Sequence, residues 1–176
     1  SLWFQGGSCQ FNVSSASMAV AIAVADFLQG EGIDAGLKWP NDVLVAGKKI
    51  CGILSEGVSA GVVIGIGLNV NMSDVEQIDQ PATSILLESG TRWRIEDVLE
   101  KLLIHVDVWM TKWLREGFVG VREVWEANAI NLGKQVSVRD GDSLRTGILR
   151  GVGHSGEMLL EENGVVSEVW AGDLSV

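Results

Sequence analysis

The 176-residue sequence has no tyrosine, only two prolines, two cysteines and two histidines, and each shortage narrows the classes of protein it can belong to. Two cysteines are too few for a disulfide framework, and Cys9 and Cys51 show no zinc-ligand spacing with His105 or His154. We therefore expect both thiols to be reduced and buried. The sequence predicts neither a disulfide-stapled secreted fold nor a zinc site.

Positive charge is scarce as well. Thirteen Lys and Arg residues against 23 Asp and Glu give a net charge of -10, which repels polyanions, so we expect no nucleic-acid partner. The longest apolar run, Met18 to Leu28, is interrupted by Asp26 and is shorter than the roughly 18 to 20 residues that a bilayer requires, so we expect no membrane span. Without a secretory signal pattern, the predicted location is the cytoplasm.

Apolar residues make up 47% of the chain, enough for one full core and a small second domain. The stretch Ala16 to Gln29 has almost no polar face and predicts a helix buried against a sheet. Glycine-separated runs then predict strands at residues 37–39, 43–45, 50–54 and 62–70, with Ala46-Gly47-Lys48 as a tight hairpin. Val62 to Ile66 does not alternate, which predicts a central strand buried on both faces.

Helical spacing returns in two segments, Ile95 to Trp113 and Val119 to Ala127, and we expect these helices to pack on the sheet from outside. Beyond Leu132, short strands separated by Asp-Gly and Asn-Gly turns predict a small β-barrel. The predicted fold is α+β. Residues 1–131 form a domain with a mixed β-sheet flanked by helices, and residues 132–176 form a small C-terminal β-barrel domain.

Polar residues gather at the ends of two predicted strands. Pro40 lacks an amide donor and ends the first strand, so Asn41 and Asp42 are presented to a ligand instead of being used in the sheet. Lys49 begins the next strand across the hairpin, where a flexible ammonium group suits an anionic oxygen. Such a lysine is often only a solvated charge, and a Pro-Asn-Asp step is often only a turn.

Three glycines, Gly52, Gly65 and Gly67, lie within predicted strands, which usually marks the close approach of a ligand or another backbone. A simple β-bulge is the alternative. The run from Gly65 to Asn69 is not a dinucleotide-binding fingerprint, because it leads to a loop and no helix N-terminus follows to receive a phosphate. Trp39 is expected in the core and not against a cofactor.

The combination and order of these residues resemble the biotin-protein ligase family. The matching segments are Lys38-Trp39-Pro40-Asn41-Asp42, then Lys49 with Gly52-Ile53-Leu54 and Glu56, then Gly65-x-Gly67-x-Asn69, Ala82-Thr83-Ser84 and finally Trp170-Ala171-Gly172-Asp173. The resemblance implies a sheet of the kind found in class II aminoacyl-tRNA synthetases and in biotinyl and lipoyl ligases. It implies an ATP-dependent ligase that forms biotinyl-AMP with Mg²⁺ and then modifies a lysine of a biotin carboxyl carrier protein.

Carried over by residue, the resemblance gives Lys49 the catalytic role of holding the biotin carboxylate and the α-phosphate together. Lys38, Asn41 and Asp42 would bind substrate or nucleotide, with Asp42 the candidate Mg²⁺ ligand, and Asn69 would bind adenine. The three strand glycines, Gly52, Gly65 and Gly67, would leave room for the biotinyl chain and the adenylate. The loop from residue 74 to 81 would close over the nucleotide.

Family members carry a Gly-Arg-rich biotin-binding loop ahead of the segment that matches Ser1 to Phe4. We therefore expect weak biotin binding and impaired ligation by this chain, and no repressor function, since the winged-helix domain of some ligases would also precede Ser1. Two alternatives stay open: a lipoate or octanoate protein ligase, and a noncatalytic module that binds ATP or a carrier protein or forms dimers. An uncovered sheet edge favours a homodimer.

Overall fold

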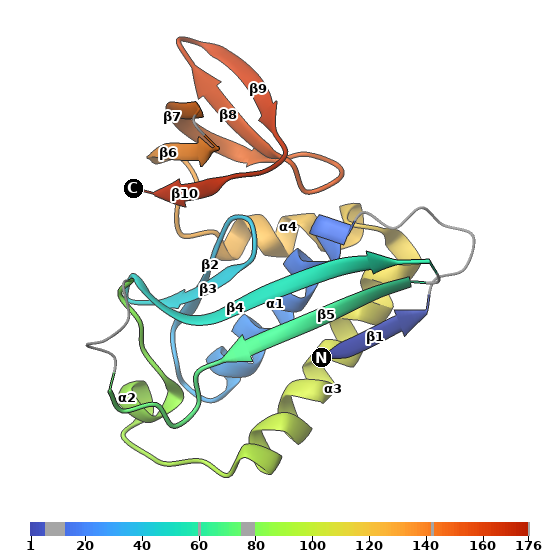
Figure 1. Cartoon of the computed structure of the whole chain (residues 1–176), viewed down its shortest axis with the longest axis vertical. Coiled ribbons are helices and arrows are strands. Elements are labelled where there is room, and N and C mark those ends of the chain that lie inside the picture. Colours follow the sequence, from blue (N-terminus) through green and yellow to red (C-terminus); the bar gives the residue numbers. More distant parts are fainter. Residues whose placement is uncertain (6–12, 60, 75–79, 142, 176) are drawn as a thin grey trace.

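The computed structural model of the chain describes residues 1–5, 13–59, 61–74, 80–141 and 143–175, which form helices and two five-stranded sheets (Figure 1). In chain order the elements are β1 (Leu2–Gln5), α1 (Val13–Gly30), β2 (Ala35–Lys38), β3 (Asp42–Val45), β4 (Lys48–Val58), β5 (Gly61–Leu68), α2 (Ile85–Ser89), α3 (Ile95–Glu116), α4 (Val119–Asn128), β6 (Gln135–Asp140), β7 (Ser143–Val152), β8 (Met158–Glu162), β9 (Val165–Val169) and β10 (Asp173–Ser175). The α+β prediction is confirmed.

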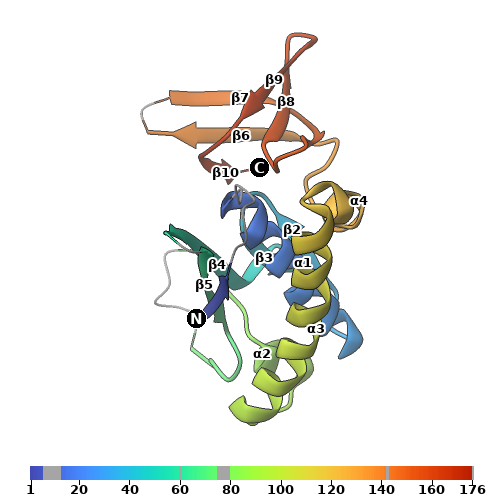
Figure 2. The same ribbon diagram turned by 90° about the vertical axis from the view of Figure 1, so that its right-hand side faces the viewer.

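The first sheet has the strand order β1-β5-β4-β3-β2, and helices cover one of its faces (Figure 2). Helix α1 packs on the sheet, while α3 packs on α1 and not directly on the strands as we had expected. The layers are therefore sheet, α1 and α3. Among the described residues no helix covers the other face of the sheet, and this face carries the polar residues of the Lys38–Asp42 segment.

One detail of the sheet differs from the expectation of mixed strand directions. Every strand pair in the described part is antiparallel, because consecutive strands from β2 to β5 are joined by short connections, whereas parallel pairing requires a long crossover. In the part of the chain that the structure describes, parallel contacts occur only as two isolated bridges, Leu37 with Ala129 and Lys49 with Ala82.

Strand β5 is buried on one face only, which corrects the prediction of a strand buried on both faces. Val62 and Ile64 are fully buried under α1, whereas Val63 and Gly65 face the open side and Gly67 is exposed. The unbroken apolar run at Val62 to Ile66 suggested a strand covered twice. The helices cover only one side of β5. Buried and partly exposed residues therefore alternate along the strand, although its sequence does not alternate between apolar and polar residues.

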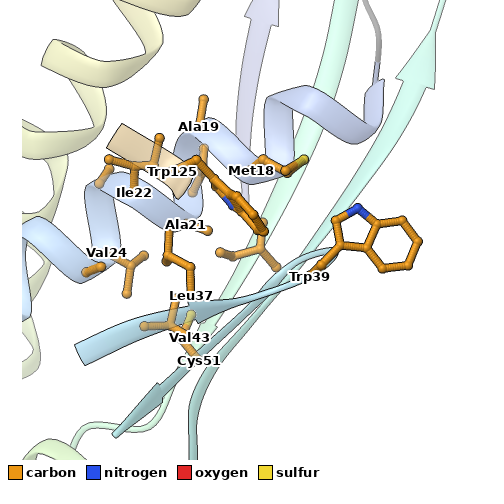
Figure 3. Close-up of a cluster of buried hydrophobic side chains, with 14 of the residues drawn as sticks. Met18, Ala19, Ala21, Ile22, Val24, Leu37, Trp39, Val43, Cys51 and Trp125 are labelled. Atoms are coloured by element: carbon orange, nitrogen blue, oxygen red, sulfur yellow. The ribbon is translucent and has the colours of Figure 1, made fainter. Parts of the chain in front are cut away.

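Helix α1 forms the centre of the core. Met18 and Ile22 from α1 meet Leu37 and Val43 from the strands and Trp125 from α4 (Figure 3). By length and composition this 18-residue helix could cross a membrane, but 72% of it is buried between the sheet and α3. Its hydrophobicity is therefore accounted for by packing within the core.

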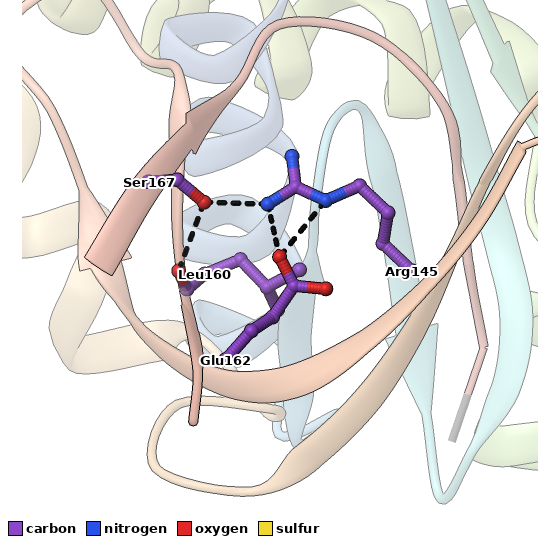
Figure 4. A network of polar contacts seen from close by, with 4 residues as sticks. All are labelled: Arg145, Leu160, Glu162 and Ser167. Atoms are coloured by element: carbon purple, nitrogen blue, oxygen red, sulfur yellow. Dashed lines mark hydrogen bonds and ion pairs between the residues drawn. The ribbon is translucent and has the colours of Figure 1, made fainter. Parts of the chain in front are cut away.

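The second sheet has the order β10-β6-β7-β8-β9. The predicted Asn-Gly hairpin between β8 and β9 has φ of 52° at Asn163 and 83° at Gly164, as a type I′ turn requires. Arg145 on β7 donates hydrogen bonds to Glu162 on β8 and Ser167 on β9, which ties three strands together (Figure 4). Among the described residues no strand pair joins β9 to β10, so the expected barrel is an open sheet whose short last strand pairs with β6 alone.

The second sheet rests on the first unit through buried contacts near Trp39. The Trp39 indole Nε1 donates to the Gly156 carbonyl at 3.0 Å, and a Cβ at Gly156 would lie 2.7 Å from Met18 Sδ. Glu126 on α4 accepts from the Val152 amide at 3.0 Å. Trp39 is buried, as predicted. The division into domains at residues 131 and 132 stays a prediction.

Candidate active site

A row of four paired residues crosses the open face of the first sheet. Lys38 on β2 pairs with Asp42 on β3, Asp42 pairs with Gly52 on β4, and Gly52 pairs with Gly67 on β5. Directly paired residues point to the same face, and neighbouring strands lie about 4.8 Å apart, so the row spans about 14 Å. The sequence segments that carried the family resemblance thus meet on one surface.

Lys49 lies across this row. Its Nζ is 2.6 Å from Asp42 Oδ1, and the two side chains are 36% and 15% exposed, so the pair lies at the boundary between solvent and protein. A Cβ at Gly52 would lie 2.9 Å from Lys49 Cε and 3.1 Å from Nζ. Because contacts this short do not occur, the absence of a side chain at residue 52 allows the ammonium group to reach Asp42.

The backbone around Lys49 is held from both sides. Its amide donates to the Pro81 carbonyl at 2.8 Å, and its carbonyl accepts from the Thr83 amide at 2.9 Å. Asn69 Nδ2 donates to the Thr83 carbonyl at 3.0 Å, and Asn41 Nδ2 donates to the Ile53 carbonyl at 2.5 Å. The first two bonds hold the segment from Pro81 to Thr83 beside β4. The other two hold the Asn69 and Asn41 side chains on backbone carbonyls.

Two adjoining hollows receive these side chains. The larger, about 870 Å³, is lined by Lys38, Asn41, Asp42, Lys49, Gly52, Gly65 and Gly67, with Gln80, Pro81 and residues 173–175 at its rim. The smaller, about 400 Å³, contains Asn69 and Ala82 and shares Lys49, Gly52 and Gly67 with the larger. Lys49 therefore stands where the two hollows meet, and every residue predicted for the site lines one or both.

Some lining residues were not predicted from the sequence. Asp173, Leu174 and Ser175 belong to β10 of the second sheet, although the Trp170–Asp173 segment had been noted as part of the resemblance. Gln80 and Pro81 end the loop that was expected to close over a nucleotide. Residues 75–79 of that loop lie outside the described residues.

Cys51 lies in the buried layer beneath the site. Burial raises the pKa of its thiol to about 12, with the nearby Asp42 charge acting in the same direction. The thiol therefore stays protonated at physiological pH and cannot act as a nucleophile. Its burial is as predicted, while Cys9 lies outside the described residues.

The residues present fit a magnesium ion only in part. No group of three or more His, Cys, Asp or Glu side chains in the described part of the chain could hold a metal. Mg²⁺ often binds proteins through one or two carboxylates while phosphate oxygens and water complete its shell, and Asp42 could serve in that way. The Asp42 carboxylate already contacts the Lys49 ammonium, so a metal would have to share this carboxylate with Lys49.

Sequence comparison finds relatives that are ligases. The Biotin/lipoate A/B protein ligase family model matches residues 3–72. The biotin–[acetyl-CoA-carboxylase] ligase of Paracoccus denitrificans is 32% identical over 168 residues, which cover 89% of this chain and 69% of that protein. The bifunctional ligase/repressor BirA of Bacillus subtilis is 28% identical over 169 residues, covering 91% of this chain and 52% of that protein. The chain thus spans about half the length of the BirA relatives.

A comparison with solved structures leads to the same family as the sequence comparison. The biotin protein ligase from Aquifex aeolicus in complex with biotin and ATP superposes with a TM-score of 0.87 and 27% sequence identity. The match covers 99% of this chain and 75% of that one. Both sheets and the helices between them are therefore included in the likeness.

Proposed function

The chain belongs to the biotin-protein ligase family, and from this premise we propose that it carries the ATP-side part of a biotin ligase site. In this proposal the enzyme joins biotin to ATP as biotinyl-AMP and then transfers the biotinyl group to a lysine of a biotin carboxyl carrier protein. The observation that carries the proposal is the position of Lys49, which is held by Asp42 where two hollows meet.

In the first step a biotin carboxylate oxygen attacks the α-phosphorus of ATP. The new C(O)O–P bond forms as the bond between the α-phosphorus and the bridging oxygen breaks, and pyrophosphate leaves with that electron pair. Lys49 would contact both the carboxylate and the α-phosphate, so its ammonium offsets their repulsion and stabilises charge on the phosphoryl oxygens. Asp42 would orient the ammonium. Magnesium, when bound by Asp42 and the phosphates, would neutralise further phosphate charge.

Each of the two hollows would hold one half of the adenylate. The smaller one, with Asn69, would take the nucleoside end. The strip of Gly52, Gly65 and Gly67 carries no side chains of its own and would accept the biotinyl chain beside the Lys49 ammonium, which lies above Gly52. Lys38 and Asn41 would contact the nucleotide phosphates or the carboxylate from the edge of the row.

In the second step the neutral amine of the acceptor lysine attacks the acyl carbon. The C–N bond forms, the C–O bond to AMP breaks, and the amine gives up one proton to water. Because the amine attacks the adenylate directly, no covalent enzyme intermediate is needed. The acceptor domain, a homodimer and the cytoplasmic location stay predictions. Lipoate is the alternative acyl substrate, since the matching family includes both biotin and lipoate ligases.

Biotin-dependent exchange of labelled pyrophosphate into ATP tests the proposal. Lys49→Gln should lower the exchange rate at least about a hundredfold, because the removed charge contacts the reacting groups. Lys112→Gln is the matched control: Lys112 lies over the Trp109 ring, away from the site, and its loss should leave the rate unchanged. Exchange that depends on lipoate instead of biotin, or that survives in Lys49→Gln, would contradict the proposal. Calorimetry with biotin tests the expectation of weak biotin binding.

A further inference from the structure

Helix α3 is apolar on more than the side that packs on the core. Five of its apolar side chains are buried: Val98, Leu102, Val106, Met110 and Trp113. Six large apolar side chains of the same helix are exposed: Ile95, Leu99, Leu103, Ile104, Val108 and Leu114. The helix lies on the far side of α1 from the sheet (Figure 2), and a surface helix normally carries polar residues where it faces away from the core. The outward side of α3 therefore has the composition of a surface that a partner covers.

The residues furthest from the core follow one stripe along α3, the outer stripe. A helix turns by about 100° per residue, so residues spaced alternately by four and three lie one above the other. The outer stripe consists of Asp97, Lys101, Ile104, Val108, Thr111 and Arg115. Ile104 and Val108, at its middle, are 61% and 56% exposed. The outer stripe is thus apolar at its centre and carries opposite charges at its two ends.

The outer stripe is complementary to itself when two copies lie antiparallel. A two-fold axis beside residue 106 places Ile104 against Val108 of the second copy, and Asp97 against Arg115 of the second copy. A parallel arrangement would instead place each charge against the same charge. Opposite charges at both ends therefore favour one orientation and one register.

A hollow of about 400 Å³ adjoins the acidic half of the outer stripe. It is lined by Trp93, Asp97, Glu100, Lys101 and Ile104. The Lys101 ammonium is turned to Glu31, with Nζ 2.6 Å from Oε1, so the carboxylates of Asp97 and Glu100 are left to attract a cation. In the antiparallel arrangement, Arg115 of the second copy reaches this hollow.

The ion pairs that these residues already form are easily exchanged. Asp97 Oδ1 lies 3.9 Å from Arg94 Nη1, and Arg115 contacts the neighbouring Glu116. Both pairs are at the surface, where an ion pair contributes little free energy. Lys112, beside the outer stripe, lies over an aromatic ring of its own helix.

We propose that α3 binds a second copy of this chain through the outer stripe, as an antiparallel pair of helices. This assigns the homodimer to α3 and not to the sheet edge expected from the sequence. The contact runs for about 27 Å, which is small for a specific interface, so we expect a dissociation constant of about 10 to 100 μM that rises with salt. The candidate active site lies on the opposite face of the first sheet, so it stays accessible in the dimer, and the proposal does not depend on the proposed function.

A mixing experiment with two charge-reversed variants tests the pairing. Asp97→Arg and Arg115→Asp each oppose like charges twice in the dimer, and sedimentation equilibrium should show each variant associating about threefold to tenfold more weakly than the unaltered chain. An equimolar mixture of the two should form a heterodimer about as tight as the unaltered dimer, because every opposed pair again has opposite charges. Within one chain the two residues are about 27 Å apart, so the recovery cannot arise inside one molecule.

The apolar centre has its own variant. Ile104→Gln should weaken association at least about tenfold, since the side chain lies beside the two-fold axis, and it should leave the free energy of unfolding unchanged because Ile104 is exposed. Leu144→Gln, at a residue of β7 that is 56% exposed, is the matched control and should change neither.

Three results would overturn the proposal. The unaltered chain stays monomeric up to about 500 μM, well above the expected dissociation constant; the mixture associates no better than each variant alone; or Ile104→Gln dimerises as tightly as Leu144→Gln, which would assign the dimer to another surface such as the sheet edge.

Discussion

The space above Gly52 is occupied by the Lys49 side chain, which crosses β4 to reach Asp42. The nearest atoms to an added Cβ are the far end of this flexible lysine and not backbone. A methyl group at residue 52 would therefore displace the ammonium group and leave the sheet intact. A substitution at residue 52 can therefore move the Lys49 ammonium group without disrupting the sheet.

Gly52→Ala should reduce biotin-dependent pyrophosphate exchange by about tenfold to a hundredfold while lowering the free energy of unfolding by less than about 1 kcal/mol. Urea unfolding measures the stability and the exchange assay measures the activity. Gly30→Ala at the end of α1 is the control, because nothing lies within 4 Å of a Cβ there and neither quantity should fall. A loss of stability that matches the loss of activity would refute the displacement of Lys49.

The parts of the site that the sequence predicted come from one continuous region, residues 38–69. The pairing register of the strands brings Lys38, Asp42 and Lys49 together. The tight turn at Ala46-Gly47 sets this register, so it can be predicted from the sequence. Ser175 could not be found in this way. It reaches the site through the packing of the second sheet on the first, which no local pattern encodes.

At the scale of elements, α1 and α3 are joined by a polar contact at the edge of their apolar interface. Asp26 Oδ2 accepts from Trp109 Nε1 at 2.9 Å and contacts His105 Nδ1 at 3.0 Å. Partial burial opposes ionisation of Asp26, but the hydrogen bonds from Trp109 and His105 and the His105 charge outweigh it. The pKa of Asp26 is held below its usual value of 3.8.

A carboxylate whose pKa is lower in the folded state stabilises the fold above its unfolded pKa and loses that effect as the pH falls through the folded pKa. Asp26→Asn should therefore lower the free energy of unfolding at pH 6, and the difference from the unaltered chain should shrink below about pH 4. Because the side chain is 48% exposed, we expect less than about 1 kcal/mol. Urea unfolding from pH 6 to pH 3 measures it. Asp107→Asn, on the exposed side of α3, is the control; a gap that widens in acid would contradict the assignment.

The helices and hairpin strands were predictable because each follows a local rule. The apolar spacing from Ile95 to Trp113 predicted α3, which continues to Glu116 and is capped by Gly117. Helix α2 was missed because five residues are too few to show a period, although Ser84 caps it by accepting from the Leu87 amide. Strand β10 was missed because its three residues gain their structure from pairing with β6.

At the scale of the whole molecule, the second sheet packs on Trp39, which precedes the turn at Pro40-Asn41. The Trp39 indole, which precedes that turn, donates across the junction to Gly156, and Gly156 has φ of 89° and no room for a side chain beside Met18. Backbone bonds from Gly133 to Leu149 and from Leu149 to Lys134 hold the connection from α4 to the sheet. The site therefore depends on both units, since β10 also lines it.

These contacts predict that the two sheets unfold together, even though the chain was predicted to form two domains. Trp39→Phe keeps an aromatic side chain but removes the indole N–H and part of its buried bulk. The Gly156 carbonyl then lacks its donor and a small cavity opens, which together should cost about 1 to 3 kcal/mol. Hydrogen exchange measured by mass spectrometry at rising urea should then show protection lowered equally in α1 and in β7 and β8. Trp170→Phe, at a 58% exposed tryptophan in the connection between β9 and β10, should change neither. Protection lost from the second sheet alone would mean that the two units are independent, and Trp39 would then be a local packing residue with no part in joining them.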